Sequence, residues 1–530
     1  MSRERFRMPQ TLFTNATLVL DGCADLQPSF NVLVKDGRIV SVSPKPVDVH
    51  DATVIDIGGR TLMPGLIDAH AHITGLSLTP KNIAYPAAEI AIAAANYLRA
   101  CLMDGYTTIR EAGGADHATA RLLAEGHIIG PRLYYSGRAL TQTGGGADFR
   151  TPDENVDPSG QIGPFSNMSV ITDGVDQVRK AAREELRRGA TQIKLFASGG
   201  VVFPAEGHAT RYEFSEVEVA AVVEEAASRG TYVMAHVYTD EGVRRCLKAG
   251  VRSIEHANFV SEETVQMMAA CGAFYVPTFI SLVQRVESAA ETHLPDSIVE
   301  NINRTIARGK QVYGWAQKHK VPTGFGTDLW GPDAQKSQLR EFETRQAIDT
   351  PARILRSATA TNAELLMEKG TLGTIAEGAY ADLLVVEGNP LADLGVLMNP
   401  QKNLKLIMKP STRTSSPHDR NAGCLAPLAG HPRPHPLRFA GSCEVGGLLF
   451  PRPGNVDHHA RRLGIPARGV VARDRDRRGQ ECQPALRGIR ARWGRPPREV
   501  SRLPARASGP DAAVTDPVVR LQCLRGARSG

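Results

Sequence analysis

The sequence has no apolar run of about 18 residues, so it offers no segment that could cross a membrane as a helix. The first residues, MSRERFRMPQTLF, lack both an apolar core and a small-residue cleavage site, so no secretory signal is expected. The eight cysteines show neither CxxC spacing nor the dense framework of small secreted domains. These absences, with 42% hydrophobic and 22% charged residues, predict a soluble cytoplasmic protein with reduced thiols.

Lysine is absent after residue 410, where arginine, proline and glycine dominate and the apolar periodicity is lost. Residues 411–530 contain 22 Arg and 9 Asp or Glu, a net charge of +13, so the +7 of the whole chain leaves −6 for residues 1–410. Because the body is mildly acidic, we expect it to bind no nucleic acid. The composition of residues 410–530 is typical of a disordered tail or of a gene translated out of frame.

Short strands are predicted at both ends of the remaining chain. Residues 11–60 contain several of them, and the turn dipeptide Asp36-Gly37 joins two into a hairpin. Residues 365–409 contain two more, at 382–387 and 404–408. Since the first group is too small to form a complete sheet alone, we expect both groups to form one small β-sandwich module.

Strands and helices alternate between these two groups, in residues 61–364. The eight candidate strands are 62–69, 107–110, 132–136, 192–196, 232–235, 253–255, 274–277 and 323–326. Apolar residues at three- and four-residue spacing predict helices between most of them, at 87–102, 175–188, 216–229, 240–249 and 264–270. Eight strands with intervening helices predict a (β/α)8 TIM barrel rather than an open sheet.

Imidazoles stand at the ends of several predicted strands. His70 and His72 follow the first strand, and residues at i and i+2 of a strand face the same side, about 6.5–7 Å apart. That pair alone is equally typical of exposed loop histidines. His236 and His256 end the fifth and sixth strands, and this repeated placement favours one metal site at the mouth of the barrel.

Three further polar residues occupy comparable positions. Lys194 lies between apolar neighbours, where an unpaired ammonium is costly to bury, although lysines near strand ends are usually ion-paired. Asp328 ends a glycine-containing strand that allows close approach, and its carboxylate is suited to bind metal and exchange protons. Asp68, two residues before His70, is expected to support the histidines from behind and to fix a tautomer.

Longer motifs in the chain resemble those of a known family. The matching segments are MPGLIDAHAH at 63–72, Lys194 with ASGGV at 197–201, His236, SIEH at 253–256, GTD at 326–328, TATNA at 359–363 and GTIAEGAYADL at 373–383. Together they resemble the metal-dependent amidohydrolase superfamily, in the branch where a carboxylated lysine bridges two metals. The segment GRALTQTGG at 137–145 is most similar to that of Xaa-Pro dipeptidases and ochratoxinase-like amidases. The resemblance covers residues 11–409, about three quarters of the chain.

This resemblance implies a site with two divalent ions, by preference zinc, although manganese or cobalt would also suit the ligands. Its implied ligands are His70, His72 and Asp328 for the more buried ion, His236 and His256 for the more exposed ion, and Lys194, carboxylated by carbon dioxide, as the bridge. A hydroxide that bridges the ions would attack the substrate carbonyl, and Asp328 would pass its proton to the leaving amine. Tyr238 would donate a hydrogen bond to the carbonyl oxygen, or would simply pack at the rim.

The sequence departs from the family pattern at two places. Gly146-Ala147-Asp148 stands where this branch has His-Gly-Asp, so either the substrate preference differs or His208 takes the place of the missing imidazole. The chain also leaves the pattern after Lys409, so the β-module is expected to lack its edge strand.

The resulting hypothesis is a binuclear metal hydrolase that cleaves the C–N amide bond of an N-acyl amino acid, a dipeptide or an ochratoxin-like amide. A carbamate, urea or ester hydrolase would use the same metals and differ only in the loops at the rim. A deaminase fits less well, because such relatives work with one metal and lack the bridging lysine. An inactive or nucleic-acid-binding relative is a further alternative, and the resemblance also implies a homo-oligomer.

Overall fold

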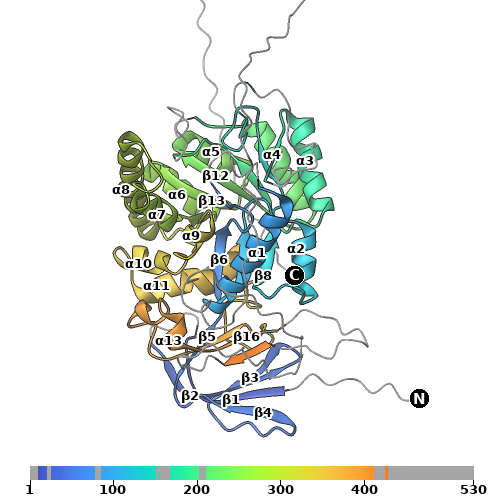
Figure 1. Ribbon diagram of the computed structural model, residues 1–530, viewed down its shortest axis with the longest axis vertical. Helices are drawn as coiled ribbons and strands as arrows, with labels where there is room; N and C mark the ends of the chain where they lie inside the picture. The colour runs from blue at the N-terminus through green and yellow to red at the C-terminus, as the bar shows by residue number, and fades with distance from the viewer. Residues whose placement is uncertain are drawn as a thin grey trace, which may run out of the picture. The chain divides into compact units, whose positions relative to one another are not determined.

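Two groups of strands build the described part of the chain: a ring of parallel strands and a mixed sheet at one end of it (Figure 1). The computed structural model describes residues 10–20, 25–77, 85–150, 153, 168–201 and 211–410, and the backbone of 424–427. All of them belong to one unit, which spans residues 1–445. The rest of the predicted tail, and also His208, lie outside the described residues.

Eight strand positions form the ring, in sequence order. The strands that fill the first seven positions are β6 (Leu66–Ala71), β7 (Tyr106–Glu111), β8 (Arg132–Tyr135), β9 (Ala139–Thr141), β11 (Ile193–Phe196), β12 (Val233–Thr239), β13 (Ser253–Phe259) and β14 (Phe274–Val276). β8 and β9 share one position, because β8 pairs with β7 and β9 with β11, and Gly137 (φ +70°) bends the chain between them. The short β10 (Ser169–Ile171) pairs with β9 at the margin.

Residues 323–327 hold the eighth position and close the ring. The amide of Gly324 donates to the Tyr275 carbonyl of β14, and the Ala69 amide of β6 donates to the Phe325 carbonyl. The last segment of the ring is therefore bonded on one side to the preceding strand and on the other to the first. This closure is what a (β/α)8 barrel requires.

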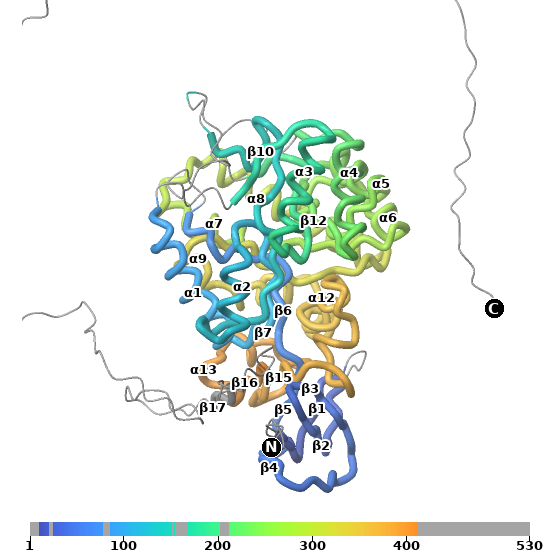
Figure 2. The backbone as a smooth tube through the Cα atoms, turned by 90° about the vertical axis from the view of Figure 1, so that its right-hand side faces the viewer, coloured from blue at the N-terminus to red at the C-terminus, as the bar shows by residue number. Residues whose placement is uncertain are grey.

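Helices surround the ring (Figure 2). Those of the barrel are α1 (Ala87–Met103), α2 (His117–Ala124), α3 (Val175–Arg187), α4 (Glu216–Ser228), α5 (Asp240–Ala249), α6 (Glu262–Cys271), α7 (Phe279–Glu287) and α8 (Asp296–Lys318). The five expected helices are confirmed, with ends shifted by two residues or fewer. The helices α2, α7 and α8 were not among those expected, and in α8 Thr305 and Gly309 interrupt the apolar spacing of the buried face.

Shorter elements complete the chain toward residue 410. They are α9 (Pro332–Gln335), α10 (Arg340–Gln346), α11 (Pro351–Arg356), a π-helical turn (Ser357–Thr361), α12 (Asn362–Leu365), a 3-10 turn (Leu394–Val396) and α13 (Pro400–Asn403). Among the described helices, none is both long enough and apolar enough to cross a membrane.

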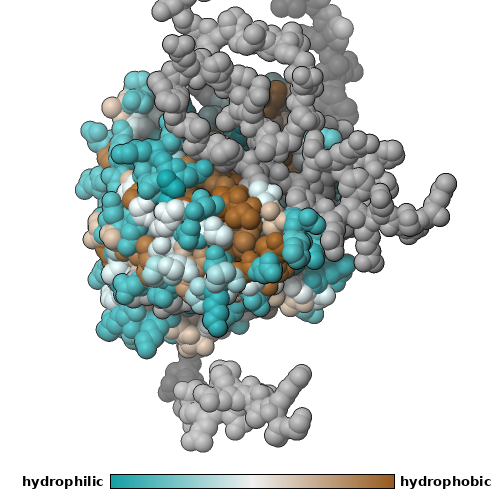
Figure 3. Space-filling view, turned by 90° about the horizontal axis from the view of Figure 1, so that it is seen from below, coloured by the Kyte–Doolittle hydropathy of each residue, from teal (hydrophilic) through white to brown (hydrophobic). Residues whose placement is uncertain are grey.

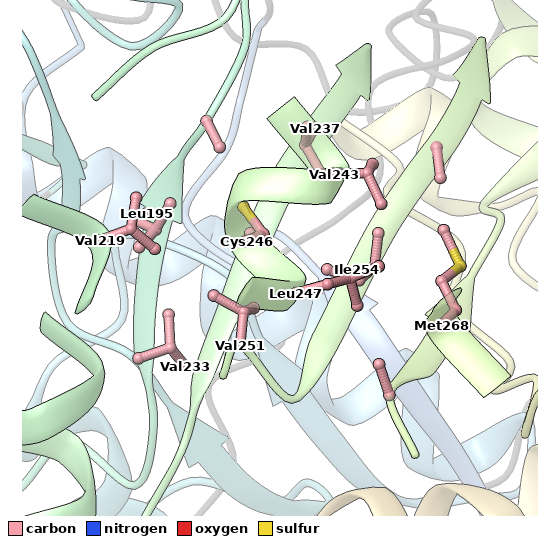
Figure 4. Close-up of a cluster of buried hydrophobic side chains, with 14 of the residues drawn as sticks. Leu195, Val219, Val233, Val237, Val243, Cys246, Leu247, Val251, Ile254 and Met268 are labelled. Carbon is pink, nitrogen blue, oxygen red and sulfur yellow. The ribbon is translucent and has the colours of Figure 1, made fainter. Parts of the chain in front are cut away.

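An apolar layer fixes the ring strands against their helices. Figure 4 shows side chains of β11, β12 and β13 packed against those of α4, α5 and α6, including Leu195, Val237, Cys246, Ile254 and Met268. The apolar strand residues Leu195, Val237 and Ile254 alternate along their strands with the polar residues Lys194, His236 and Glu255. The chain enters α5 directly from β12, where the Thr239 hydroxyl accepts a hydrogen bond from the Gly242 amide. This tight turn places the end of β12 at the rim of the ring.

The second group of strands is hydrogen-bonded into one branched sheet, which is the added β-module. Its strands are β1 (Gln10–Leu18), β2 (Gln27–Lys35), β3 (Arg38–Ser43), β4 (Ala52–Asp56), β5 (Thr61–Pro64), β15 (Leu383–Val386), β16 (Leu404–Lys409) and β17 (Cys424–Pro427). The branch arises because β1 pairs with β2, β4 and β5. β15 joins the sheet by pairing with β5, which confirms that both ends of the body contribute to one module.

Two expectations about this sheet were wrong. The expected strand 62–69 is divided at Gly65 into β5 of the sheet and β6 of the ring. Glycine is required at the division, because a Cβ there would collide with Thr107 of β7. The edge strand expected to be missing is also present, since the backbone of β17 pairs with β16.

From below, the described surface is mostly hydrophilic with a hydrophobic area near its centre (Figure 3), and Val54 of β4 is 61% exposed.

A buried ion pair supports the last strand position from behind. Arg345 of α10 donates to the Glu341 carboxylate (Nε–Oε1 2.6 Å) and to the Gly324 carbonyl (2.9 Å), and both charged side chains are fully buried. The other oxygen of Glu341 accepts from the Ile280 amide of α7 (2.7 Å). One carboxylate thus ties α7, α10 and the segment 323–327 together.

We predict that Glu341→Gln lowers the free energy of unfolding by about 3 kcal/mol, because it leaves the buried Arg345 guanidinium without its counter-charge. Chemical denaturation of the full chain measures this change. Glu343→Gln is the matched control on the same helix, since Glu343 pairs with Arg340 at 57% side-chain exposure and should change stability by less than about 1 kcal/mol. Equal effects of the two substitutions would contradict the assigned role of Glu341.

Candidate metal centre

Six polar side chains singled out in the sequence come together at the carboxyl ends of the ring strands: His70, His72, Lys194, His236, His256 and Asp328. Ligand atoms of His70, His256 and Asp328 all lie within 4.8 Å of one another. Asp328 Oδ1 is 3.2 Å from His72 Nε2, and Lys194 Nζ is 3.5 Å from His70 Nε2. The ring of His236 is 4.6 Å from that of His256. Strands that are far apart in sequence therefore deliver one cluster.

The imidazoles turn one nitrogen away from the cluster and the other toward it. His70 Nδ1 is 2.7 Å from Glu255 Oε2, and His256 Nδ1 is 2.8 Å from Thr278 Oγ1. The Nε2 atoms of His236 and His256 are buried and have no hydrogen-bond partner. Buried polar atoms are rarely left without a partner, so these two nitrogens fit the coordination of a metal ion.

Burial keeps these imidazoles neutral. It lowers the pKa of His70, His236 and His256 well below the ordinary histidine value, and the nearby ammonium of Lys194 lowers it further. A neutral imidazole is the form that binds metal. Burial also lowers the pKa of Lys194 to about 8, although the Glu255 and Asp328 carboxylates oppose this shift. The imidazoles are therefore neutral at physiological pH, and Lys194 loses its proton more easily than an exposed lysine.

Glu255 and Arg110 support the cluster from inside the ring, a role that the sequence did not suggest. Glu255 Oε2 accepts a hydrogen bond from the His70 imidazole, and both carboxylate oxygens of Glu255 accept from Arg110 Nη2 (2.9 and 3.2 Å). Strand alternation would place Glu255 and His256 on opposite faces of β13. The positive φ of His256 (+71°) breaks that alternation, so both side chains contribute to the site.

Asp68 was expected to support the histidine side chains, but its carboxylate bonds to other groups. Its Oδ1 accepts from the backbone amide of His70 (3.0 Å), and its Oδ2 accepts from the Thr327 hydroxyl (2.6 Å) and Gln338 Nε2 (2.8 Å). The carboxylate lies beside the backbone of β6 because the ring closes there against residues 323–327. Asp68 thus joins the first and last strand positions, and Glu255 holds the tautomer of His70.

Close approach at the ring closure depends on Gly326. A Cβ at this position would lie 2.7 Å from His70 Cβ and 2.7 Å from Val276 Cγ1, too close for either neighbour. Asp328 follows with φ +53°, a conformation that side chains rarely adopt. The expected role of glycine in this strand is therefore confirmed, and it positions Asp328 against His70.

An open cavity of about 750 Å³, part of it solvent at the mouth, lies over the cluster. Its lining includes His72, Lys194, His236, Asp328, Tyr238 and Gly146, together with Phe149, Met168, Phe196, Leu282 and Trp330. Tyr238 stacks on His256 at 5.0 Å, and burial raises its pKa, so the hydroxyl stays a hydrogen-bond donor. Trp330 Nε1 donates to Asp328 Oδ1 (3.2 Å). The sequence did not reveal the aromatic part of this lining, because Phe149, Phe196 and Trp330 lie far apart in the chain.

Gly146 fits closely between its neighbours. A Cβ there would be 3.2 Å from Gly199 Cα, Phe196 Cδ1 and the Ser198 carbonyl oxygen. The Gly146 amide donates to Glu213 Oε1 (2.7 Å), which fixes the loop. A larger side chain at this position would need Phe196 or the backbone of Ser198 and Gly199 to move.

A family model describes most of this structure. The model of the amidohydrolase family matches residues 61–416, which include the six clustered residues. The chain belongs to the amidohydrolase family. It is a metal-dependent amidohydrolase, an enzyme that hydrolyses C–N bonds, and it has the α/β fold of that family with an added β-sheet module. The cluster of His70, His256 and Asp328 is consistent with a metal site of this family.

Named relatives support the resemblance to Xaa-Pro dipeptidases and ochratoxinase-like amidases that the sequence showed. Ochratoxinase of Aspergillus niger is 34% identical over 364 residues, which cover 64% of this chain and 73% of the relative. A solved prolidase in complex with N-methylphosphonate-L-proline is 37% identical, with a TM-score of 0.72 over 76% of this amidohydrolase and 98% of the prolidase. A solved Xaa-Pro dipeptidase with bound methionine is 26% identical, with a TM-score of 0.65 and the same coverage. The expected family placement is thus confirmed.

We predict that Glu255→Gln lowers metal affinity by about 10- to 100-fold, because Gln holds the His70 tautomer less well and leaves Arg110 without its counter-charge. Chelator competition on the metal-loaded full chain measures the affinity. Glu185→Gln is the control, since Glu185 is an equally buried glutamate that pairs with Arg138 and touches no member of the cluster. A similar loss in both variants would show that Glu255 acts only through general stability.

Proposed function

We propose that this amidohydrolase uses two metal ions to hydrolyse the amide bond of N-acyl amino acids, dipeptides or ochratoxin-like amides. The observation that carries the proposal is the set of imidazoles whose Nε2 atoms turn to one centre beside Lys194 and Asp328. The ochratoxinase, prolidase and Xaa-Pro dipeptidase relatives support the substrate class. A cytoplasmic location and a homo-oligomeric state stay predictions.

The donor set divides into two groups. His70, His72 and Asp328 would hold one ion, and His236 and His256 the other, with carboxylated Lys194 between them. The pKa of Lys194, about 8, leaves a fraction of neutral amine near physiological pH, and carbon dioxide reacts with that form. Mixed imidazole and carboxylate donors suit zinc, with manganese or cobalt as alternatives. Bound ions of this kind polarise a carbonyl and lower the pKa of water.

Residues of the chain then perform the remaining steps. Asp328 accepts the proton of the attacking water and returns it to the leaving nitrogen, so the amine departs neutral. Its hydrogen bond from Trp330 fixes the carboxylate during this transfer. Tyr238, beside His256, donates to the carbonyl oxygen as negative charge develops there. Gly146 contributes to the wall that faces the substrate.

The full chain loaded with zinc tests the proposal on a panel of N-acyl amino acids, Xaa-Pro dipeptides, carbamates, ureas and esters. Release of free amine from the amides, lost on metal removal with a chelator and restored with zinc, is the expected result. Absence of amine release at full metal occupancy would refute the amidase function. Faster release of alcohol or carbon dioxide from esters or carbamates would favour those alternatives instead.

We predict that Asp328→Asn lowers kcat by at least about 1,000-fold, since an amide cannot carry the proton, and that Tyr238→Phe lowers it by about 10- to 100-fold. Steady-state kinetics with metal content determined in parallel separates lost turnover from lost metal. Asp333→Asn is the control, because Asp333 lies in the neighbouring helix α9 with 94% of its side chain exposed, and this change should leave kcat unchanged. Near-wild-type kcat in metal-loaded Asp328→Asn would exclude the proton-transfer role.

A further inference from the structure

Thr278 connects the end of β14 to the start of α7, at the rim of the ring. β14 pairs with β13 in a register that sets Val276 opposite Glu255, so the residues just after Val276 lie beside His256. Oγ1 of Thr278 is 2.8 Å from Nδ1 of His256. Both side chains are buried, at 1% exposure each. The hydroxyl of Thr278 therefore meets the outer nitrogen of this imidazole away from water.

The backbone of Thr278 is strained. Its φ of +50° and ψ of +53° lie in the left-handed region, which a β-branched residue rarely adopts. Glycine would adopt this conformation without the steric penalty of a Cβ. Strain of this kind is retained only where the surrounding structure requires it, and it is concentrated at functional sites. Threonine offers a hydroxyl that glycine lacks, and that hydroxyl bonds to His256.

The hydroxyl of Thr278 does not cap the helix that follows it. At the same position before α5 and α6, the side chains of Thr239 and Ser261 each accept a hydrogen bond from a backbone amide of the first turn, the usual role of these residues there. At α7 the amide of Ile280 donates to Glu341 Oε2 instead (2.7 Å). Because Glu341 bonds to the first turn of α7, the hydroxyl of Thr278 can bond outside its own helix.

This hydrogen bond selects one form of the His256 ring. A neutral imidazole carries a proton on one nitrogen, and its other nitrogen can bind a metal ion. When Nδ1 carries the proton and donates it to Thr278 Oγ1, the lone pair is on Nε2. That Nε2 is buried and has no hydrogen-bond partner among the described residues, and the His256 ring lies 4.6 Å from the ring of His236. The bond to Thr278 thus favours the tautomer in which Nε2 is ready to bind.

We propose that Thr278 is a positioning residue for one of the two metal ions, and that its hydroxyl holds the His256 ring with Nε2 toward the ion at His236 and His256. This assignment rests on the two-ion arrangement of the proposed function and adds a separate support for the second ion. Glu255 supports the first ion through His70. The affinities of the two ions therefore depend on different side chains.

Thr278→Val tests the assignment, because valine keeps the shape, the β-branching and the backbone strain of threonine and removes only the hydroxyl. Chelator competition with zinc on the full chain measures the affinity of each ion. The affinity of the ion at His256 should fall by about 10- to 100-fold, while that of the ion at His70 should change by less than about threefold. Thr278→Ser keeps the hydroxyl and should restore most of the affinity.

Thr305→Val is the matched control. Thr305 is a fully buried threonine of α8 whose hydroxyl donates to the Asn301 carbonyl (2.7 Å), so the substitution removes a buried hydroxyl that bonds to no member of the cluster. It should leave both affinities unchanged. Equal losses for both ions in Thr278→Val, or full retention of both, would overturn the assignment of Thr278.

The ¹⁵N NMR signals of the histidine rings in the metal-free chain separate this assignment from the proposed function. They report which nitrogen of His256 carries the proton, once the signals of this ring are identified by their loss in His256→Asn. The wild type and Thr278→Ser should hold the proton on Nδ1, and Thr278→Val should lose this preference. A wild type that binds one ion, or that hydrolyses no amide, would refute the proposed function. An unchanged tautomer of His256 in Thr278→Val would overturn the assignment of Thr278 in either case.

Discussion

Several buried imidazoles share a small space with the amine of Lys194, and this crowding is tolerable only while the imidazoles stay neutral. Burial keeps protons off His70, His236 and His256. Glu255 supplies fixed negative charge inside the ring, and Arg110 in turn holds Glu255. The orientation of His70 thus depends on a chain of contacts that reaches across three strands of the ring. The other residues of the cluster are placed by the ring itself, since each lies near the carboxyl end of a ring strand.

Much of the fold could be predicted because strand and helix periodicities recur along residues 61–364. The placement of His236 and His256 at strand ends was visible for the same reason, since parallel strands bring their ends to one rim. Glu255 was missed because alternation alone assigns it to the face opposite His256, and only the positive φ at His256 reverses this.

The β-module illustrates a different limit. Its strands were foreseen from local turns and apolar runs, but its branching at β1 depends on three pairings that no local pattern specifies. The need for glycine at residue 65, where the chain passes from the sheet to the ring, likewise comes from close packing on Thr107, which no local pattern shows. Asp68 was assigned correctly to the neighbourhood of His70 but bonds to the backbone, because the last strand position lies directly beside it.

The metal centre lies across the seam where residues 323–327 meet β6. Asp328 and His70 come from opposite ends of the barrel segment, and the amides of Thr327 and Asp328 donate to the His70 carbonyl. During synthesis, the chain must therefore extend past residue 328 before a complete donor set can exist. A metal ion held by both His70 and Asp328 would therefore also hold the two ends of the barrel together, and its binding would stabilise the closed ring.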